Sequence, residues 1–180
     1  KNFSEDWKKK RLAEARFLRA FFYHEVWMAY GGVPIIKKPL NIATDGDSIF
    51  YPRTTFQETG RFIINELGEI ANDLPNEVSK GRATRAAALT LKAWCELFMH
   101  NYEDAAISCQ DVMNLGAHSL YPDYNGLFMG INNNNVESIF AYQHDGITKK
   151  SLRSGYYGPI GSYNTSSCSD RSGSMQPAQS

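Results

Sequence analysis

Apolar side chains recur every three or four positions over residues 5–30, and this spacing predicts one long helix. From residue 17 onward nearly every side of that helix is apolar, so we expect it to be buried between other helices. The glycine pair at 31–32 and Pro34 end it. The stripe expected to face the core comprises Leu12, Ala15, Leu18, Phe22, Val26 and Ala29.

A second helix is predicted from Thr55 to the residue before Pro75. The run Thr55-Phe56-Gln57-Glu58 fits a capping box, in which the Thr55 hydroxyl accepts from the Glu58 amide and the Glu58 carboxylate reaches back. Its apolar stripe comprises Phe56, Ile63, Ile64, Leu67, Ile70, Ala71 and Leu74. The connection between the two helices, residues 31–54, contains three prolines and is unusually long, and long connections inside compact domains are often functional.

Two further helices are predicted over residues 83–100 and 102–115, with a break at Asn101 and a stop at Gly116. Three consecutive alanines at 86–88 allow a neighbouring helix to approach closely. The residues expected to fill the interfaces are Leu91, Trp94, Leu97 and Phe98 on the third helix and Ala105, Ala106, Cys109, Val112 and Met113 on the fourth.

The last two helices form a hairpin whose turn, Asn101 to Ala105, closely resembles that of a tetratricopeptide repeat. The first two helices look like a divergent copy with an insertion at 31–54. A single hairpin cannot bury its own apolar face, so the hairpins are expected to stack. The predicted fold is therefore mostly α: tetratricopeptide-like hairpins in an α-α superhelix, with long loops and one or two short strands. Residues 1–116 form the helical region and 117–180 a loop-rich, incomplete segment, with a strand at 136–142.

Composition and charge narrow the function. With 42% hydrophobic and 21% charged residues the chain can bury a core, so it is not a disordered chain. Nineteen basic and nineteen acidic residues cancel, which argues against a general nucleic-acid binder. The charges are segregated, because residues 1–20 carry seven basic and three acidic side chains and residues 41–80 carry three and seven. We expect two solvated faces that attract each other weakly through water.

No catalytic or metal-binding motif is complete. His24-Glu25 begins like a zinc-protease motif, but Met28 stands where the second histidine is needed. The three cysteines, Cys95, Cys109 and Cys168, lack the spacing of a zinc site, and the first two are expected to be small core residues. We expect a protein without metal or cofactor, and not an enzyme. A hydrolase using Asp45 and Asp47 is the weakest alternative.

Aromatic residues are the positive signal, since 13% of the chain is Phe, Trp or Tyr and several lie in expected loops, Phe50 among them. The apolar face of a sugar ring can stack on an aromatic ring, while its hydroxyl groups need polar neighbours. Loop tyrosines beside Asp, Asn or Arg supply both contacts. The candidate ligand-binding residues are Asp45, Asp47, Tyr51, Arg53, Tyr156 and Tyr157.

Several short motifs together resemble the SusD/RagB family. They begin with the helix at 13–20 and Tyr30-Gly31-Gly32-Val33-Pro34, and they continue in the family's order. The later pieces are Ile64-Asn65-Glu66-Leu67, Leu74-Pro75, Gly81-Arg82-Ala83-Thr84, Ala86-Ala87-Ala88-Leu89, Tyr102-Glu103-Asp104-Ala105-Ala106, Tyr124-Asn125-Gly126-Leu127-Phe128 and Glu137-Ser138-Ile139-Phe140. Each is ordinary, but the ordered combination over about residues 13–142 is specific.

The resemblance implies a lipid-anchored protein on the outer face of a Gram-negative outer membrane. Members bind oligosaccharides or peptides without cleaving them and pass them to a TonB-dependent, SusC-type transporter. The lipid-bearing cysteine is expected before Lys1, and much of the binding surface after Ser180. An exposed apolar face is then expected where that remainder packs. The alternative function is a helical-repeat adaptor that binds a protein or peptide segment.

Overall fold

The structure, a computed structural model, describes residues 2–77, 81–127, 132, 134–141 and 143. All of these except Gln143 belong to one compact unit, Lys1–Ala141. Its long helices are α1 (Glu5–Tyr30), α3 (Phe56–Ile70), α4 (Arg85–Phe98) and α5 (Tyr102–Asn114). The shorter elements are α2 (Ile42–Asp45), α6 (Tyr124–Leu127) and the 3-10 turns η1 (Gly46–Ile49) and η2 (Ala71–Asp73).

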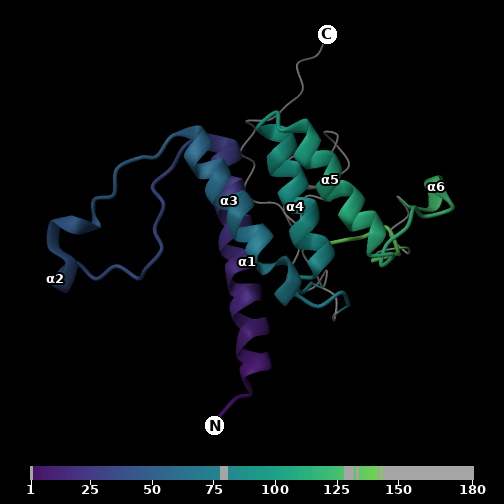
Figure 1. The fold of residues 1–180 in the computed structure, drawn as a ribbon, viewed down its shortest axis with the longest axis horizontal. Coiled ribbons are helices and arrows are strands. Elements are labelled where there is room, and N and C mark those ends of the chain that lie inside the picture. Colours follow the sequence, from purple (N-terminus) through teal and green to yellow (C-terminus); the bar gives the residue numbers. More distant parts are fainter. Residues whose placement is uncertain (1, 78–80, 128–131, 133, 142, 144–180) are drawn as a thin grey trace, which may run out of the picture. The chain divides into compact units, whose positions relative to one another are not determined.

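The four long helices pack in chain order, α1 on α3, α3 on α4, and α4 on α5 (Figure 1). The mostly α, tetratricopeptide-like class predicted from the sequence is therefore confirmed, and the boundaries of α1, α4 and α5 lie within about two residues of the prediction. The α3 helix begins as predicted but ends at Ile70, and the 3-10 turn η2 takes the place of its predicted last turn. The domain division at residue 116 stays a prediction.

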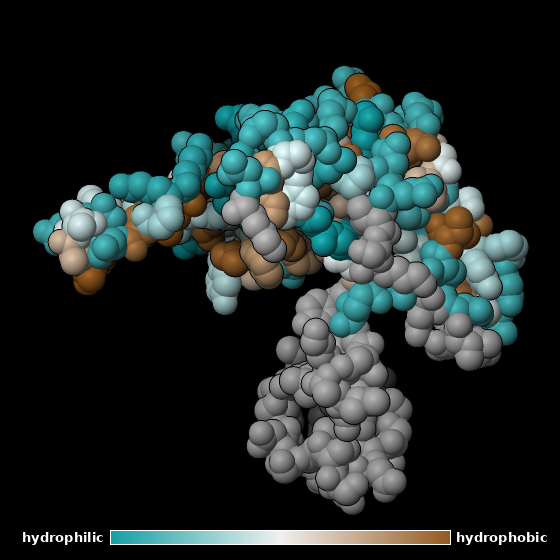
Figure 2. All heavy atoms as spheres, turned by 90° about the horizontal axis from the view of Figure 1, so that it is seen from below, coloured by the Kyte–Doolittle hydropathy of each residue, from teal (hydrophilic) through white to brown (hydrophobic). Residues whose placement is uncertain are grey.

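The core lies where α3 meets its neighbours. The predicted α3 stripe is confirmed, since Ile63, Leu67 and Ile70 are at most 1% exposed. The three alanines of α4 are also buried. Cys95 lies in the same core, where burial raises the pKa of its thiol to about 12 and leaves it unreactive at neutral pH. Hydrophilic side chains cover most of the face seen in Figure 2, with apolar patches among them.

The predicted inward face of α1 is wrong by one position. The buried stripe is Ala13, Phe17, Ala20, His24 and Trp27. Leu12 and Phe22, which the spacing placed in the core, are each 62% exposed. Because the helix is apolar on nearly all sides, its periodicity does not define one direction, and polar contacts with α3 orient it instead. The expectation that this part of α1 is buried on all sides is also wrong.

The interface between α4 and α5 differs from the prediction as well. Trp94 and Leu97 are 56% and 54% exposed, and Phe98 is 38% exposed. On α5, Ala106, Cys109 and Met113 are exposed. The interface instead buries a polar group: Lys92 donates to Glu96 at 2.6 Å and to Ser108 at 2.8 Å. Ser108 in turn donates to Glu96 at 2.6 Å. This closed network satisfies the buried carboxylate and sets the rotation of both helices.

The strand predicted at 136–142 is wrong over the described residues 136–141, which form turns and irregular backbone. Local hydrogen bonds replace strand pairing: the Glu137 amide donates to the Asn135 side chain and the Ser138 amide to the Asn135 carbonyl. Ile139 and Phe140 then pack on the helical core. No strand occurs anywhere in the part of the chain that the structure describes.

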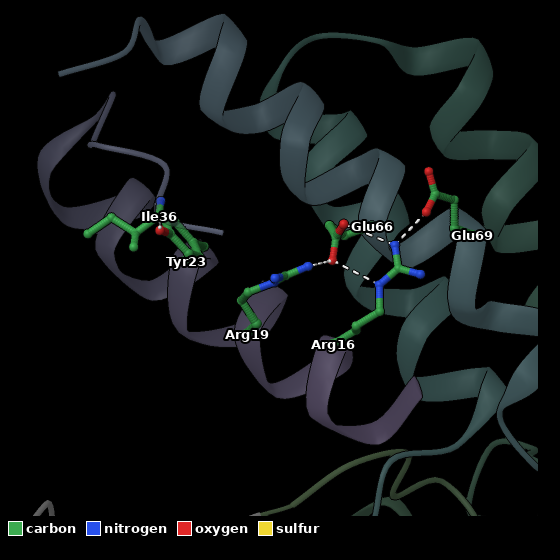
Figure 3. A network of polar contacts seen from close by, with 6 residues as sticks. All are labelled: Arg16, Arg19, Tyr23, Ile36, Glu66 and Glu69. Carbon is green, nitrogen blue, oxygen red and sulfur yellow. Dashed lines mark hydrogen bonds and ion pairs between the residues drawn. The ribbon is translucent and has the colours of Figure 1, made fainter. Parts of the chain in front are cut away.

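The segregated charges meet directly, and not only through water as the sequence suggested (Figure 3). Arg16 of α1 holds the Glu66 carboxylate of α3 with two hydrogen bonds of 2.9 and 3.1 Å. Arg19 also bonds Glu66, and Arg16 bonds Glu69. The Glu66 side chain is only 13% exposed. Burial opposes its ionisation, but the two arginines outweigh that effect and lower the pKa of Glu66.

The lowered pKa makes this contact sensitive to acid. Its contribution is complete above the ordinary glutamate pKa of 4.5 and is lost as the pH falls through the lower folded-state value. We therefore expect the Tm of the wild type to fall between about pH 5 and pH 3 by more than that of Glu66→Gln. Thermal unfolding at both values tests this. Equal losses in the two proteins would show that Glu66 adds nothing to the acid response.

The capping box that begins α3 is confirmed. The Glu58 amide donates to the Thr55 hydroxyl at 3.1 Å, and the Thr55 amide donates to the Glu58 carboxylate at 2.8 Å. Thr55→Ala should lower the free energy of unfolding by about 1 kcal/mol, because it removes one partner of the cap. Urea titration measures the change. Thr55→Ser keeps the hydroxyl and should stay close to the wild type; equal losses in both variants would exclude the cap as the cause.

Candidate functional site

Residues 31–54, here called the arm, leave the helical body between α1 and α3 and return to it (Figure 1). α2 and η1 form the far end of the arm. The long connection predicted from the prolines is thus present, and it projects from the body as one structural element. Four of the six predicted ligand-binding residues lie on it: Asp45, Asp47, Tyr51 and Arg53. Tyr156 and Tyr157 lie outside the described residues.

The base of the arm is closed by contacts between its two ends. A Cβ atom on Gly32 would lie 2.0 Å from the Thr54 carbonyl oxygen, so only glycine fits this close approach. The Arg53 guanidinium donates to the carbonyl groups of Tyr30 and Gly32. Thr54 donates its hydroxyl to the Val33 carbonyl at 2.6 Å. The two ends therefore enter and leave the body at one fixed point.

Residues of α1 and α3 form hydrogen bonds with the base of the arm. Thr59 of α3 is fully buried, and its hydroxyl accepts from the Val33 amide at 3.2 Å. On α1, the Tyr23 hydroxyl accepts from the Ile36 amide at 2.7 Å and donates to the Pro34 carbonyl at 3.3 Å (Figure 3). The first residues of the arm are thus bonded to both helices, and its position follows that of the body.

The far end of the arm is held by its own polar groups. The Asn41 side chain accepts from the Ala43 amide at 3.0 Å and caps α2. The Asp45 carboxylate accepts from the Asn41 amide at 2.9 Å and lies 3.6 Å from the Lys38 ammonium group. The Asn41 amide, with a smaller contribution from Lys38, lowers the pKa of Asp45. Asp45 is therefore an ionised structural cap of this tip.

The outer surface of the arm combines apolar and charged side chains. Ile42 is 76% and Phe50 is 78% exposed, while Asp47 is exposed and Tyr51 half-buried. In Figure 2 the arm projects at the left with hydrophobic patches among hydrophilic residues. An exposed ring and an exposed carboxylate on one short segment offer a stacking surface and a hydrogen-bond acceptor, which are the contacts that a sugar needs.

The structure divides the predicted site residues by position. Asp47 and Tyr51 lie on the projecting part, with Asp45 within the tip and Arg53 at the base. Phe50 is the most exposed aromatic ring of the arm, and it was not among the predicted ligand residues. The sequence signal that could have identified Phe50 as a ligand residue was its place between expected turns and next to Tyr51. Their roles toward a ligand stay predictions.

A second feature that sequence reasoning missed lies at the turn between α4 and α5. An open depression of about 410 Å³ is lined by His100, Asn101, Tyr102, Glu103 and Asp104. The rings of His100 and Tyr102 stack with centroids 5.9 Å apart. His100 has a φ of 64°, which is uncommon for a residue other than glycine.

Among residues with a described position, no group of three His, Cys, Asp or Glu side chains could hold a metal ion. Within the same residues, no helix is both long and apolar enough to span a bilayer.

Known proteins with this architecture identify its family. The family model described as "Starch-binding associating with outer membrane" matches residues 1–97. This chain belongs to the SusD-like family. A SusD-like protein of Bacteroides ovatus is 31% identical over 151 residues, which are 78% of this chain and 27% of that protein.

Solved structures of the family share the fold of this chain. A SusD-like protein from Bacteroides fragilis is 34% identical, with a TM-score of 0.72 over 79% of this chain and 29% of its own. A laminarin-binding SusD-like protein is 25% identical, also with a TM-score of 0.72, over 79% of this chain and 32% of its own. The chain thus spans about three tenths of the length of the relatives that it matches.

Proposed function

We propose that this chain is the helical scaffold of a surface protein that captures oligosaccharides on the arm. The observation behind the proposal is an arm fixed at its base that presents Ile42, Asp47 and Phe50 to solvent. Starch-binding is part of the family's description, and one solved relative is named for laminarin binding. An aromatic and acidic surface on a positioned loop agrees with a glycan ligand.

The proposed role is binding without cleavage. A glycosidase needs one carboxyl group that stays protonated near neutral pH, so its pKa must be raised. Asp45 has the opposite perturbation, because hydrogen bonding to Asn41 lowers its pKa. Asp47 is exposed and lies on the same short tip. This pair of carboxylates favours recognition of hydroxyl groups.

We further propose the setting that family membership implies. The protein is held on the outer face of the outer membrane through a lipid anchor, and it passes its ligand to a SusC-type, TonB-dependent transporter for nutrient uptake. The family's description as associating with the outer membrane supports this location. A peptide as ligand, or the role of a helical-repeat adaptor, is the competing proposal. The helical fold alone agrees with both, while the family and its glycan-binding members favour a glycan.

Calorimetric titration distinguishes these ligands. The protein encoded by the complete reading frame is titrated with laminarin oligosaccharides, with malto-oligosaccharides and with a pool of short peptides. We expect heat of binding with one glycan class. Binding to peptides alone would support the adaptor, and silence with all three would contradict capture of these ligands.

Tyr51 provides the point test of the arm. Tyr51→Ala should weaken glycan binding by about 1–3 kcal/mol, since removal of an aromatic contact from a binding surface has effects of this size. Tyr51→Phe keeps the ring and should retain most of the affinity. The titration above measures both variants against the wild type. An unchanged affinity in Tyr51→Ala would remove this residue from the site.

A further inference from the structure

The charged residues of the arm are separated along its length. The tip, here residues 41–51, contains the carboxylates of Asp45 and Asp47 but no lysine, arginine or histidine. The basic residues of the arm, Lys37, Lys38 and Arg53, all lie outside the tip. The part of the arm that projects farthest from the helices is therefore acidic.

Each basic side chain of the arm already has a partner. Arg53 donates to two backbone carbonyl groups at the base. The Lys37 ammonium group lies 5.4 Å from the centre of the Phe62 ring on α3. The Lys38 ammonium group lies 3.6 Å from the Asp45 carboxylate, so it offsets one of the two negative charges of the tip.

Asp47 is the carboxylate of the tip that keeps its full charge toward solvent. Its side chain is exposed, and among the residues that the structure describes no lysine or arginine forms an ion pair with it. The two elements of the tip, α2 and η1, contact each other and none of the other described helices. A ligand bound at the tip would therefore meet the Asp47 charge without a neighbouring cation.

The same turn places an exposed aromatic ring on the side of Asp47. The Phe50 amide donates to the Asp47 carbonyl at 3.2 Å and closes the 3-10 turn η1. Side chains three positions apart in such a turn lie one above the other. Phe50 is 78% exposed, and the face of an aromatic ring carries negative potential. The ring and the carboxylate thus present the same electrostatic sign to a ligand.

We propose that Asp47 makes the arm selective for neutral oligosaccharides over anionic ones, such as chains of uronic acids or sulfate esters; this inference rests on the proposed capture of glycans by the arm. A neutral sugar stacks its C–H face on Phe50 and donates hydroxyl groups to Asp47. An acidic group on the sugar meets Asp47 with no cation to pair with it, and like charges held close together weaken binding. Asp47 is thus a specificity-determining residue that attracts hydroxyl groups and repels acids.

Titration with pairs of glycans that differ in charge tests the selection. Laminarin oligosaccharides and malto-oligosaccharides are each used in neutral form and after oxidation of their primary hydroxyl groups to carboxylates. With the protein encoded by the complete reading frame, we expect the oxidised form of the bound class to bind about tenfold more weakly at low salt. Equal or tighter binding of the oxidised form would overturn the selection.

The salt dependence separates repulsion from the simple loss of a hydroxyl contact. Salt screens exposed charges, so the tenfold difference should shrink to about threefold when the salt concentration is raised from about 0.02 M to about 0.5 M. A lost hydroxyl contact would give a ratio that does not change with salt. A constant ratio would therefore overturn the role of the Asp47 charge.

Asp47→Asn tests the residue itself. It removes the charge of the side chain but keeps its size, and the low-salt ratio between neutral and oxidised glycan should fall from about tenfold to about threefold or less. Asp111→Asn is the matched control. It removes the same charge from an exposed position of α5, a helix that contacts neither α2 nor η1, and should keep the wild-type ratio. Equal ratios in the two variants would overturn the assignment to Asp47.

The outcomes also distinguish this inference from the proposed function. An oxidised glycan that binds as tightly as its neutral form keeps glycan capture but overturns the selection. Silence with all four glycan preparations contradicts both. Weaker binding of the oxidised form that depends on salt and on Asp47 supports both.

Discussion

Trp27→Ala should lower the free energy of unfolding by about 3–5 kcal/mol. Trp27 is completely buried, and its ring packs against Phe56 at 4.7 Å and Phe98 at 5.1 Å. Its indole nitrogen also donates to the Phe56 carbonyl at 3.0 Å. The substitution leaves a cavity where α1, α3 and α4 meet and leaves that carbonyl without its indole donor. Urea unfolding of the 180-residue chain, followed by circular dichroism, measures the loss.

Trp94→Ala is the matched control. Trp94 is more than half exposed in this chain, so its truncation should cost less than about 1 kcal/mol there. The sequence instead placed Trp94 inside the hairpin interface, where its truncation would be costly. If Trp94→Ala were the more destabilising of the two in the 180-residue chain, the packing of α1 against α4 would be wrong.

The helices could be predicted because their signals are local. Thr55 and Glu58 define the start of α3 without help from distant residues, and the capping box appears as expected. The α3 stripe has polar residues on its other side, so its buried face follows from spacing alone. Position and length were thus available from hydrogen-bonding side chains and periodicity.

The orientation of α1 could not be predicted for a physical reason. A helix with apolar residues on most sides can bury any of them, and the choice falls to its neighbours. Here Arg16 and Arg19 bind Glu66 of α3, and this contact turns Phe17 and Trp27 inward. Such a contact joins residues about fifty positions apart, which no local pattern reveals.

The buried polar group between α4 and α5 shows the same limit. Ser108 and Glu96 are 1% and 3% exposed, although their residue types are mostly found at the surface. They are buried because Lys92 completes the network. Sequence patterns assign polar residues such as Glu96 and Ser108 to the solvent-exposed surface. The prediction therefore placed Cys109 and Met113 in the core instead.

The candidate site was predictable in place but not in detail. Its prolines and length marked residues 31–54 as a functional connection, and the arm is there. The contacts of Arg53 with Tyr30 and Gly32 arise only when both ends of the arm meet, so its position at the base could not be foreseen. Phe50 was named among the loop aromatics but not chosen as a ligand residue, because composition alone does not distinguish a presented ring from one that anchors a loop.

Gly32→Ala should destabilise the protein by about 3 kcal/mol or more, because overpacking against backbone cannot be relieved by a side-chain rotation. The added Cβ would lie 2.0 Å from the Thr54 oxygen, 2.6 Å from the Thr55 carbonyl carbon and 2.9 Å from the Phe56 nitrogen. The base of the arm must therefore separate. Urea unfolding measures the loss of stability, and amide exchange at Val33 reports the opening.

Gly68→Ala is the control for the replacement of a glycine by alanine at a position with free space. Gly68 is exposed in α3, and its added Cβ would meet only the Lys92 Cε atom, at an ordinary 3.7 Å. Alanine should then stabilise the helix by about 0.5–1 kcal/mol. A loss of stability similar to that of Gly32→Ala would show that the close approach of Gly32 to Thr54 is not the cause.

The Gly32→Ala variant also tests whether glycan binding depends on the position of the arm. Gly32 lies at the base, away from the Phe50 and Asp47 side chains that the arm presents. If glycan capture depends on the position of the arm, Gly32→Ala should weaken binding in the full reading-frame protein even under conditions where the helices stay folded. Gly68→Ala should bind as the wild type does. Unchanged glycan affinity in a folded Gly32→Ala protein with fast exchange at Val33 would mean that the ligand does not bind on the arm.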